Sequence, residues 1–231
     1  MRWTILFLFL ATALPAQDID IFADGEHGQL AGSYRNQGRH APLVLIIPGS
    51  GPIDRNGLRV GVPGIGVYQR LADELEANNI SSVRIDKRGG FASIDAIIDS
   101  DDFRISGYAD DARAWVTRMQ MLTDNCIWVF GHSEGGLVAS VMVADDQSGI
   151  CGLILAAAPG RPIDQVLYDQ LTRYTKSNRV LGMIRNTLAQ LKSGQEANPK
   201  TLPLLLRHLF TPTNQRYFID WMTYDPAHVL A

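Results

Sequence analysis

The stretch CIWVFGHSEGG, residues 126–136, decides the fold of this chain. It joins a short apolar run to the pattern G-x-S-x-G and then to a small, apolar helical segment at 136–144. A strand, this pattern and a helix, in that order, are typical of a nucleophile elbow, in which a strained turn lifts a serine hydroxyl above a sheet. The pattern also occurs by chance, but this context favours Ser133 as a nucleophile, with Gly131 and Gly135 allowing strand and helix to approach closely.

Strand-like and helix-like segments alternate on both sides of the elbow. From residue 42 the expected order is strand, helix, strand, helix, strand, helix, strand, at 42–47, 68–75, 81–86, 108–119, 126–130, 136–144 and 151–156. Regular alternation predicts an α/β fold with a mostly parallel sheet and helices on both faces. Two further strands, at 19–22 and 30–34, read as an antiparallel hairpin at the sheet edge. After residue 160 the pattern becomes helical, at 162–174, 180–191 and 202–210, which indicates a helical cap over the crevice.

Composition narrows the class of protein. The chain has 231 residues, 46% hydrophobic and 19% charged, which is enough for one domain with a substantial core. The formal net charge is -3 and the sequence has no basic stripe, so we do not expect nucleic acid as a partner. Two cysteines and five scattered histidines give no metal-site spacing, and we expect neither a metal nor a cofactor.

The first sixteen residues have the layout of a secretory signal peptide. Arg2 supplies positive charge, residues 5–10 are an apolar run, and small residues with Pro15 follow. Cleavage is expected after Ala16, with Ala13 as second choice. An uncleaved membrane anchor ranks lower because the run is too short for a permanent span. We therefore expect a periplasmic or secreted protein without a stable membrane anchor.

The two cysteines, Cys126 and Cys151, each open an expected strand. The two strands should be neighbours in a parallel sheet, so their starting ends could lie side by side. The sequence leaves open whether the residues form a disulfide or stay as two buried thiols.

Three motifs in order give the chain a family resemblance. Residues 48–57 resemble a GSGPxDRxG loop, 84–89 an RxDKRG turn, and 131–136 a GHSEG elbow. With these, the chain resembles the α/β-hydrolase superfamily, and most of all the exported bacterial esterase-like group related to the serine aminopeptidase and dienelactone-hydrolase-like families. The resemblance implies an α/β-hydrolase fold with a helical cap after the sixth strand. One departure is the turn after Asp86, which lacks the usual RGxGxS pattern.

The larger departure lies at the end of the chain. In the family, further strands after the cap carry the acidic triad member and the catalytic histidine, whereas this sequence ends at Ala231. On this resemblance the chain is predicted to be truncated at the C-terminus, with the last strands missing. The expected organisation is a signal peptide at 1–16, the N-terminal part of the hydrolase core at 17–160, and a helical cap region at 161–231.

The resemblance also implies the chemistry. Ser133 would attack an acyl carbon, and the oxyanion would be bound by the backbone N–H of Glu134 and by the loop after the first central strand, where Ser50 is the best candidate donor, followed by Gly51. Gly49 and His132 are expected to line the substrate site.

Several other side chains are not expected to take part in the chemistry, or have a role that the sequence leaves undecided. The histidines after the nucleophile, His208 and His228, do not follow a strand with an upstream acid, so neither is expected to be the base. Asp54 and Arg55 either pair to shape the loop or form a solvated turn. Trp128 is expected in the core.

The functional hypothesis is a serine hydrolase of small carboxylic esters. One alternative is a degenerate hydrolase fold that binds ligands without turnover, and another is a serine peptidase with the same elbow. The expected partner is a small-molecule ester, and the sequence leaves the oligomeric state open.

Overall fold

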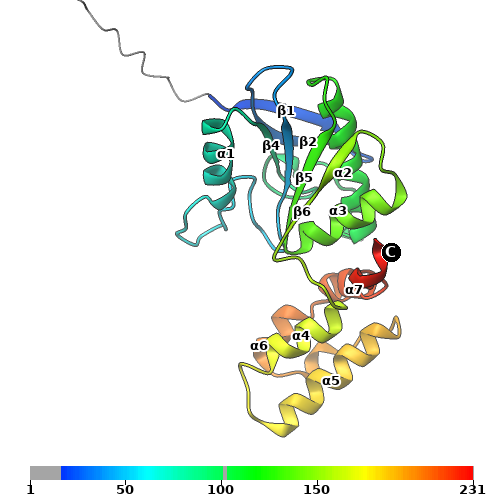
Figure 1. Ribbon diagram of the computed structural model, residues 1–231. Helices are drawn as coiled ribbons and strands as arrows, with labels where there is room; N and C mark the ends of the chain where they lie inside the picture. Colours follow the sequence, from blue (N-terminus) through cyan, green and yellow to red (C-terminus); the bar gives the residue numbers. More distant parts are fainter. Residues whose placement is uncertain (1–16, 101–102, 231) are drawn as a thin grey trace, which may run out of the picture.

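The computed structural model describes residues 17–100 and 103–230, so the predicted signal peptide at 1–16 lies outside the described residues. Six strands form one sheet in the order β1-β2-β4-β3-β5-β6 (Figure 1). Their bounds are β1 Ile19–Asp24, β2 Gln29–Arg35, β3 Leu43–Ile47, β4 Ser81–Ile85, β5 Ile127–His132 and β6 Ile150–Ala156. Strand β2 pairs antiparallel with β1 and β4, and the other pairs are parallel. The predicted mostly parallel sheet with an edge hairpin is confirmed.

Helices cover both faces of the centre of this sheet. Helix α1 (Val67–Ala77) lies on one face, and α2 (Ile105–Gln120) and α3 (Glu134–Asp145) lie on the other (Figure 1). The apolar run of β3 is buried at every position. Its odd-numbered residues 43, 45 and 47 join the large core under α2 and α3, and residues 44 and 46 pack with Tyr68 of α1. A strand buried on both faces is the reason for an unbroken apolar run rather than an alternating one.

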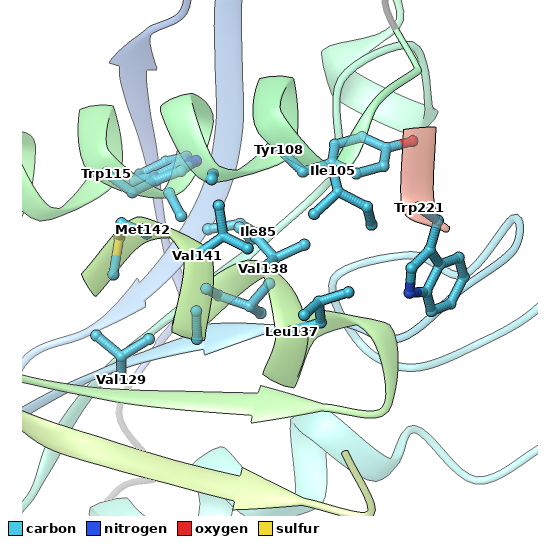
Figure 2. Packing of buried hydrophobic residues seen from close by; sticks show 14 of the residues in the cluster. Ile85, Ile105, Tyr108, Trp115, Val129, Leu137, Val138, Val141, Met142 and Trp221 are labelled. Atoms are coloured by element: carbon cyan, nitrogen blue, oxygen red, sulfur yellow. The ribbon is translucent and has the colours of Figure 1, made fainter. Parts of the chain in front are cut away.

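The large core is centred where α2 crosses α3. Figure 2 shows Trp115 and Tyr108 of α2 lying over Val138 and Met142 of α3. Trp115 is fully buried, and a β-carbon built on Gly32 of β2 would lie 2.8 Å from its Cη2. The glycine therefore makes room for the indole ring, which is how the edge hairpin packs onto the core.

A disulfide joins Cys126 and Cys151, whose Cα atoms lie 5.1 Å apart. It closes a loop with a sequence separation of 25 residues and ties the start of β5 to the start of β6. Of the two alternatives that the sequence left open, the structure has the cross-link, and its described residues include no free cysteine.

Removing this cross-link should lower stability without changing the fold. We expect Cys126→Ser with Cys151→Ser to reduce the free energy of unfolding by roughly 3 kcal/mol, because the unfolded chain regains the entropy of a closed loop. Urea unfolding followed by circular dichroism measures this as a lower midpoint. An unchanged midpoint would contradict it.

The expectation that Trp128 belongs to the core is wrong. Its side chain is 41% exposed, and Ile154 of the neighbouring strand is 44% exposed. Trp128 aligns with Val44 and so lies on the sheet face that carries α1, but α1 packs over β3 and β4. The indole instead rests against Gly152 of β6, where a β-carbon would lie 2.8 Å from its Cζ3.

Only helices and short helical turns follow residue 160 among the described residues. They are α4 Ile163–Leu171, α5 Asn178–Lys192, α6 Leu204–Leu209, α7 Pro212–Trp221, α8 Pro226–Val229 and a 3-10 turn at Pro199–Thr201. Figure 1 shows most of them beyond the end of the sheet where β6 finishes. The predicted helix at 202–210 begins later, because Pro203 is extended at its N-cap.

Helix α7 was not predicted, although its start carries a recognisable signal. The Thr211 side chain accepts a hydrogen bond from the Asn214 N–H, and Pro212 occupies the first turn. A threonine N-cap followed by proline is a favoured helix start.

Candidate active site

Ser133 occupies a strained turn between β5 and α3. Its backbone has φ 53° and ψ −120°, a conformation that non-glycine residues rarely adopt. The glycines around it are required by close backbone contacts. A β-carbon on Gly131 would lie 2.4 Å from the Gly135 oxygen, and one on Gly135 would lie 2.5 Å from the Ile47 oxygen. The turn therefore presses the start of α3 against the end of β3, as the elbow pattern predicted.

The loop after β3 lies directly beside this serine. A β-carbon on Gly49 would lie 3.3 Å from the Ser133 Cβ. The Gly49 N–H donates to the Tyr68 hydroxyl oxygen at 2.9 Å, so it is already committed. The Ser50 N–H donates to no group among residues 17–100 and 103–230. Two uncommitted donors therefore lie on the two segments that meet at Ser133. One is the backbone N–H of Ser50, and the other is the N–H of Glu134, the first residue of α3.

Gly49 and His132 do not line the cleft as expected from the sequence. The Tyr68 hydroxyl, which accepts the Gly49 N–H, also lies 2.8 Å from the His132 Nδ1. Tyr68 is buried, and this burial raises the pKa of its phenol. Its single hydroxyl group thereby links the loop at Gly49 to the last residue of β5. The role of both residues is to hold the loop against the elbow.

Lys87 makes a second link between the same two segments. Its ammonium donates to the Gly49 carbonyl oxygen at 2.9 Å and to the Glu134 carboxylate at 3.0 Å. It also lies 5.2 Å from the centre of the Tyr108 ring, within cation–π range. The Glu134 side chain is only 1% exposed, so a buried carboxylate next to Ser133 is neutralised by a partly buried cation.

Two neighbouring cavities share part of their lining and form the lobes of one cleft, and Ser133 lines the first of them. The first lobe, of about 410 Å³, is lined by Ser133, Ser50 and residues of α4 and α7; the second, of about 430 Å³, by Glu134, Lys87 and a set of aromatic side chains. Gly51, Asn214 and Tyr217 line both lobes. Each lobe is large enough for one side of a small organic ligand.

Two phenols near the second lobe are strongly influenced by burial. Burial, and then the negative charge of Glu134, raise the pKa of Tyr108 and of Tyr217. Both phenols therefore stay neutral around the Glu134 carboxylate, and neither is a base for Ser133 near neutral pH.

The turns around the cleft are fixed by buried ion pairs. Arg55 pairs with Asp86, not with Asp54, through its backbone N–H at 2.8 Å and its guanidinium at 2.7 Å. Asp54 accepts the N–H groups of residues 56 and 58 and closes the turn. Arg88 makes a two-point contact with Asp111, and burial raises the pKa of that carboxyl group. Through these contacts Asp86 and Arg88 brace the turns on which they lie.

No described residue forms a hydrogen bond with the Ser133 hydroxyl. His208 is exposed on α6, and His228 is 80% exposed, with its Nδ1 3.0 Å from an Asp225 oxygen. Neither lines a lobe that contains the serine. The described part of the chain therefore brings two uncommitted backbone N–H groups to the turn at Ser133, while it places no imidazole within hydrogen-bond distance of the serine hydroxyl.

In residues 17–100 and 103–230, no three His, Cys, Asp or Glu side chains come together in a way that could hold a metal ion. None of the helices described is long and apolar enough to cross a membrane.

The sequence pointed to Ser133, Glu134 and Ser50 but gave no site role to Tyr68 or Lys87. Lys87 follows Asp86 in the RxDKRG turn, at the end of a strand next to β3, so its position at the carboxyl edge of the sheet was a usable signal. Tyr68 carried none, because only the packing of α1 brings its hydroxyl to the loop.

The chain is similar to known hydrolases. The family model described as serine aminopeptidase, S33 matches residues 63–229. Esterase EstD of Thermotoga maritima is 26% identical over 189 residues, which are 81% of this chain and 42% of that protein. This chain thus spans less than half the length of that curated relative.

Two solved structures support the same fold. The α/β hydrolase GrgF from Penicillium sp. sh18 is 16% identical with a TM-score of 0.58, over 94% of this chain and 77% of that one. The Pyrococcus furiosus esterase Pf2001 is 14% identical with a TM-score of 0.53, over 79% of this chain and 68% of that one. Together with the sheet order, these likenesses show an α/β-hydrolase fold.

Proposed function

Since this chain belongs to the serine aminopeptidase S33 family, we propose that it is a serine hydrolase that cleaves small carboxylic esters with Ser133. The observation that carries the proposal is the meeting of Ser133, at φ 53°, with the uncommitted N–H groups of Ser50 and Glu134. A strained serine beside two backbone donors is the arrangement that acyl transfer requires.

In the proposed reaction the Ser133 hydroxyl attacks the acyl carbon and its oxygen forms a tetrahedral intermediate. The negative charge that develops on the carbonyl oxygen is bound by the two backbone N–H groups, each worth about 2.7–4 kcal/mol of transition-state stabilisation. The alcohol leaves, and water then hydrolyses the acyl-enzyme. The Ser133 lobe and the neighbouring lobe are both lined by apolar side chains, which favours esters with an apolar group on both the acyl and the alcohol side.

A serine hydroxyl needs a base to become a good nucleophile. The proposal assigns the base and its acidic partner to residues outside the described part of the chain. It is supported by the places of His208 and His228, neither of which lines the Ser133 lobe. We also retain the proposal that the helices at 161–231 act as a cap, because α4 and α7 supply much of that lobe's lining.

A peptidase is the second candidate, because the family model is described as serine aminopeptidase, whereas the curated relative is an esterase. The two candidate activities differ in the leaving group, which is an alcohol for an esterase and an amine for a peptidase. A panel of 4-nitrophenyl esters and aminoacyl 4-nitroanilides should show turnover of the esters only. Faster turnover of the anilides would favour the peptidase.

The nucleophile itself is tested by covalent labelling. A fluorophosphonate probe should react with the protein, and peptide mapping should find the label on Ser133. A label on another residue would contradict the assignment of the nucleophile. No label at all would favour the alternative of a binding protein without turnover.

Export to the periplasm or outside the cell belongs to the same proposal. The disulfide supports it, since such bonds persist in oxidising compartments. N-terminal sequencing of the mature protein should begin after Ala16, and an intact Met1 would argue against a cleaved signal peptide.

A further inference from the structure

We infer that the cleft accepts esters that carry a carboxylate, and that Arg59 recognises this group. The inference rests on the proposed ester hydrolysis at Ser133 and adds the chemical class of the substrate. Its basis is the position of Arg59, the balance of charge in the cleft and the apolar lining around it.

The chain folds back so that Arg59 lies against the oxyanion loop. Ile53 and Arg59 pair through an isolated antiparallel bridge, and the Asp54 carboxylate closes the turn between them. A β-carbon built on Gly51 would lie 3.4 Å from the Arg59 Nη2. Arg59 lines the same lobe as Ser133. The backbone bridge therefore places Arg59 beside the loop, and its side chain reaches the lobe that contains Ser133.

The other charged groups that line the cleft already have partners. Lys87 is paired with Glu134, and Arg88 is paired with Asp111. Arg59, by contrast, makes no ion pair and no side-chain hydrogen bond with any residue in 17–100 or 103–230. The cleft consequently carries one unbalanced positive charge, although the whole chain has a formal net charge of -3. Such a site favours an anionic ligand.

The remaining lining indicates which anion fits. The Ser133 lobe is otherwise mostly apolar, with side chains such as Val166, Leu167 and Phe218. A guanidinium binds a carboxylate through two parallel hydrogen bonds, and one cation balances one such group. A phosphate dianion would be left half compensated here. The favoured substrate therefore combines an apolar chain with a single carboxylate, as in a half-ester of a dicarboxylic acid.

The test compares charged and neutral forms of the same ester. The probes are the mono-4-nitrophenyl esters of succinate, glutarate and adipate, each paired with its methyl-capped diester. The readout is the ratio of kcat/KM for the charged form to that for the neutral form, which cancels any general damage to the enzyme. We expect a ratio well above one for at least one chain length. Arg59→Gln should lower this ratio about 10-fold, the usual effect of one hydrogen bond to a charged group.

Arg70→Gln is the matched control, because it removes the same charge at a different place. Arg70 is exposed on α1 and lines neither lobe. Arg70→Gln should keep the wild-type ratio, and Arg59→Lys should fall between the two. Added NaCl should reduce the wild-type preference, because Arg59 is exposed. A ratio that is equal in wild type, Arg59→Gln and Arg70→Gln, or below one at every chain length, would overturn the inference.

A binding measurement separates this inference from the proposed function. On the Ser133→Ala protein, which cannot form an acyl-enzyme, calorimetry should give a lower Kd for the charged ester than for its methyl-capped form. Adding Arg59→Gln should remove that difference. If no protein hydrolyses esters but this binding difference is present, the proposed reaction fails and carboxylate recognition stands. If esters are hydrolysed without the difference, the reaction stands and carboxylate recognition fails.

Discussion

Replacing Ser133 with alanine should abolish both ester hydrolysis and fluorophosphonate labelling. The loss in kcat should be roughly 10⁴-fold or more, because the only proposed nucleophile disappears while the oxyanion donors stay in place. Stability should hardly change. Ser133 is the N-cap residue of α3, but its side chain makes no capping hydrogen bond that alanine would lose. The measurements are steady-state hydrolysis of 4-nitrophenyl butyrate, gel fluorescence of the label, and thermal unfolding.

Ser140→Ala is the matched control for this variant. Ser140 is buried in the same helix, where its hydroxyl donates to the Gly136 oxygen at 2.9 Å. Ser140→Ala should leave the labelling rate within about threefold of the wild-type rate. The variant loses only an ordinary buried hydrogen bond, which contributes about 1 kcal/mol to the free energy of unfolding. Full activity in Ser133→Ala would remove the basis of the proposed function.

Replacing Lys87 with methionine should lower kcat by about 100-fold and leave KM nearly unchanged. The ammonium holds the Gly49 carbonyl oxygen and the Glu134 carboxylate, which belong to the two segments with the proposed oxyanion donors. Loosening both segments should cost about as much as one oxyanion donor, roughly 2.7 kcal/mol. The substituted protein also keeps a buried carboxylate without its cation, so we expect a loss of about 3 kcal/mol in unfolding free energy. Kinetics with 4-nitrophenyl butyrate and urea unfolding measure the two effects.

A second substitution, at Glu134, tests whether the loss in Lys87→Met is caused by the unpaired charge. With Lys87→Met alone, an uncompensated negative charge lies near the place where the oxyanion would form. Glu134→Gln removes that charge and keeps the size of the side chain. The double variant should therefore recover stability and at least about tenfold in kcat relative to Lys87→Met. Additive losses in the double variant would mean that the two residues act independently, and the charge argument would be wrong.

Much of the fold followed from local pattern. The alternation of strand-like and helix-like segments correctly indicated a sheet with helices on both faces, and the glycines at 131 and 135 correctly indicated a turn with close backbone approach. Such features depend on residues that are neighbours in the sequence, so a single sequence contains them. The turn of Asp54 was also accessible in this way, and one of the alternatives weighed for Arg55 was wrong because its partner, Asp86, lies 31 residues away.

The burial of individual side chains was harder to predict from the sequence. Trp128 sits in an apolar strand, yet its ring is 41% exposed. Periodicity shows that a strand has two faces, but it does not show whether a helix lies over each of them. That depends on where α1 packs, and α1 covers β3 and β4.

The sequence by itself determined the order of strands and helices, the elbow at Ser133 and the glycine-rich loop that faces it, because each is set by short-range sterics and hydrophobic spacing. Only the tertiary structure decided how the site is held and what it presents. Lys87 and Glu134 are 47 residues apart, Tyr68 and His132 are 64 apart, and they meet because parallel strands and their helices bring their ends together at one edge of the sheet. The unpaired charge of Arg59 belongs to the same category, since a residue is unpaired only with respect to neighbours that folding supplies.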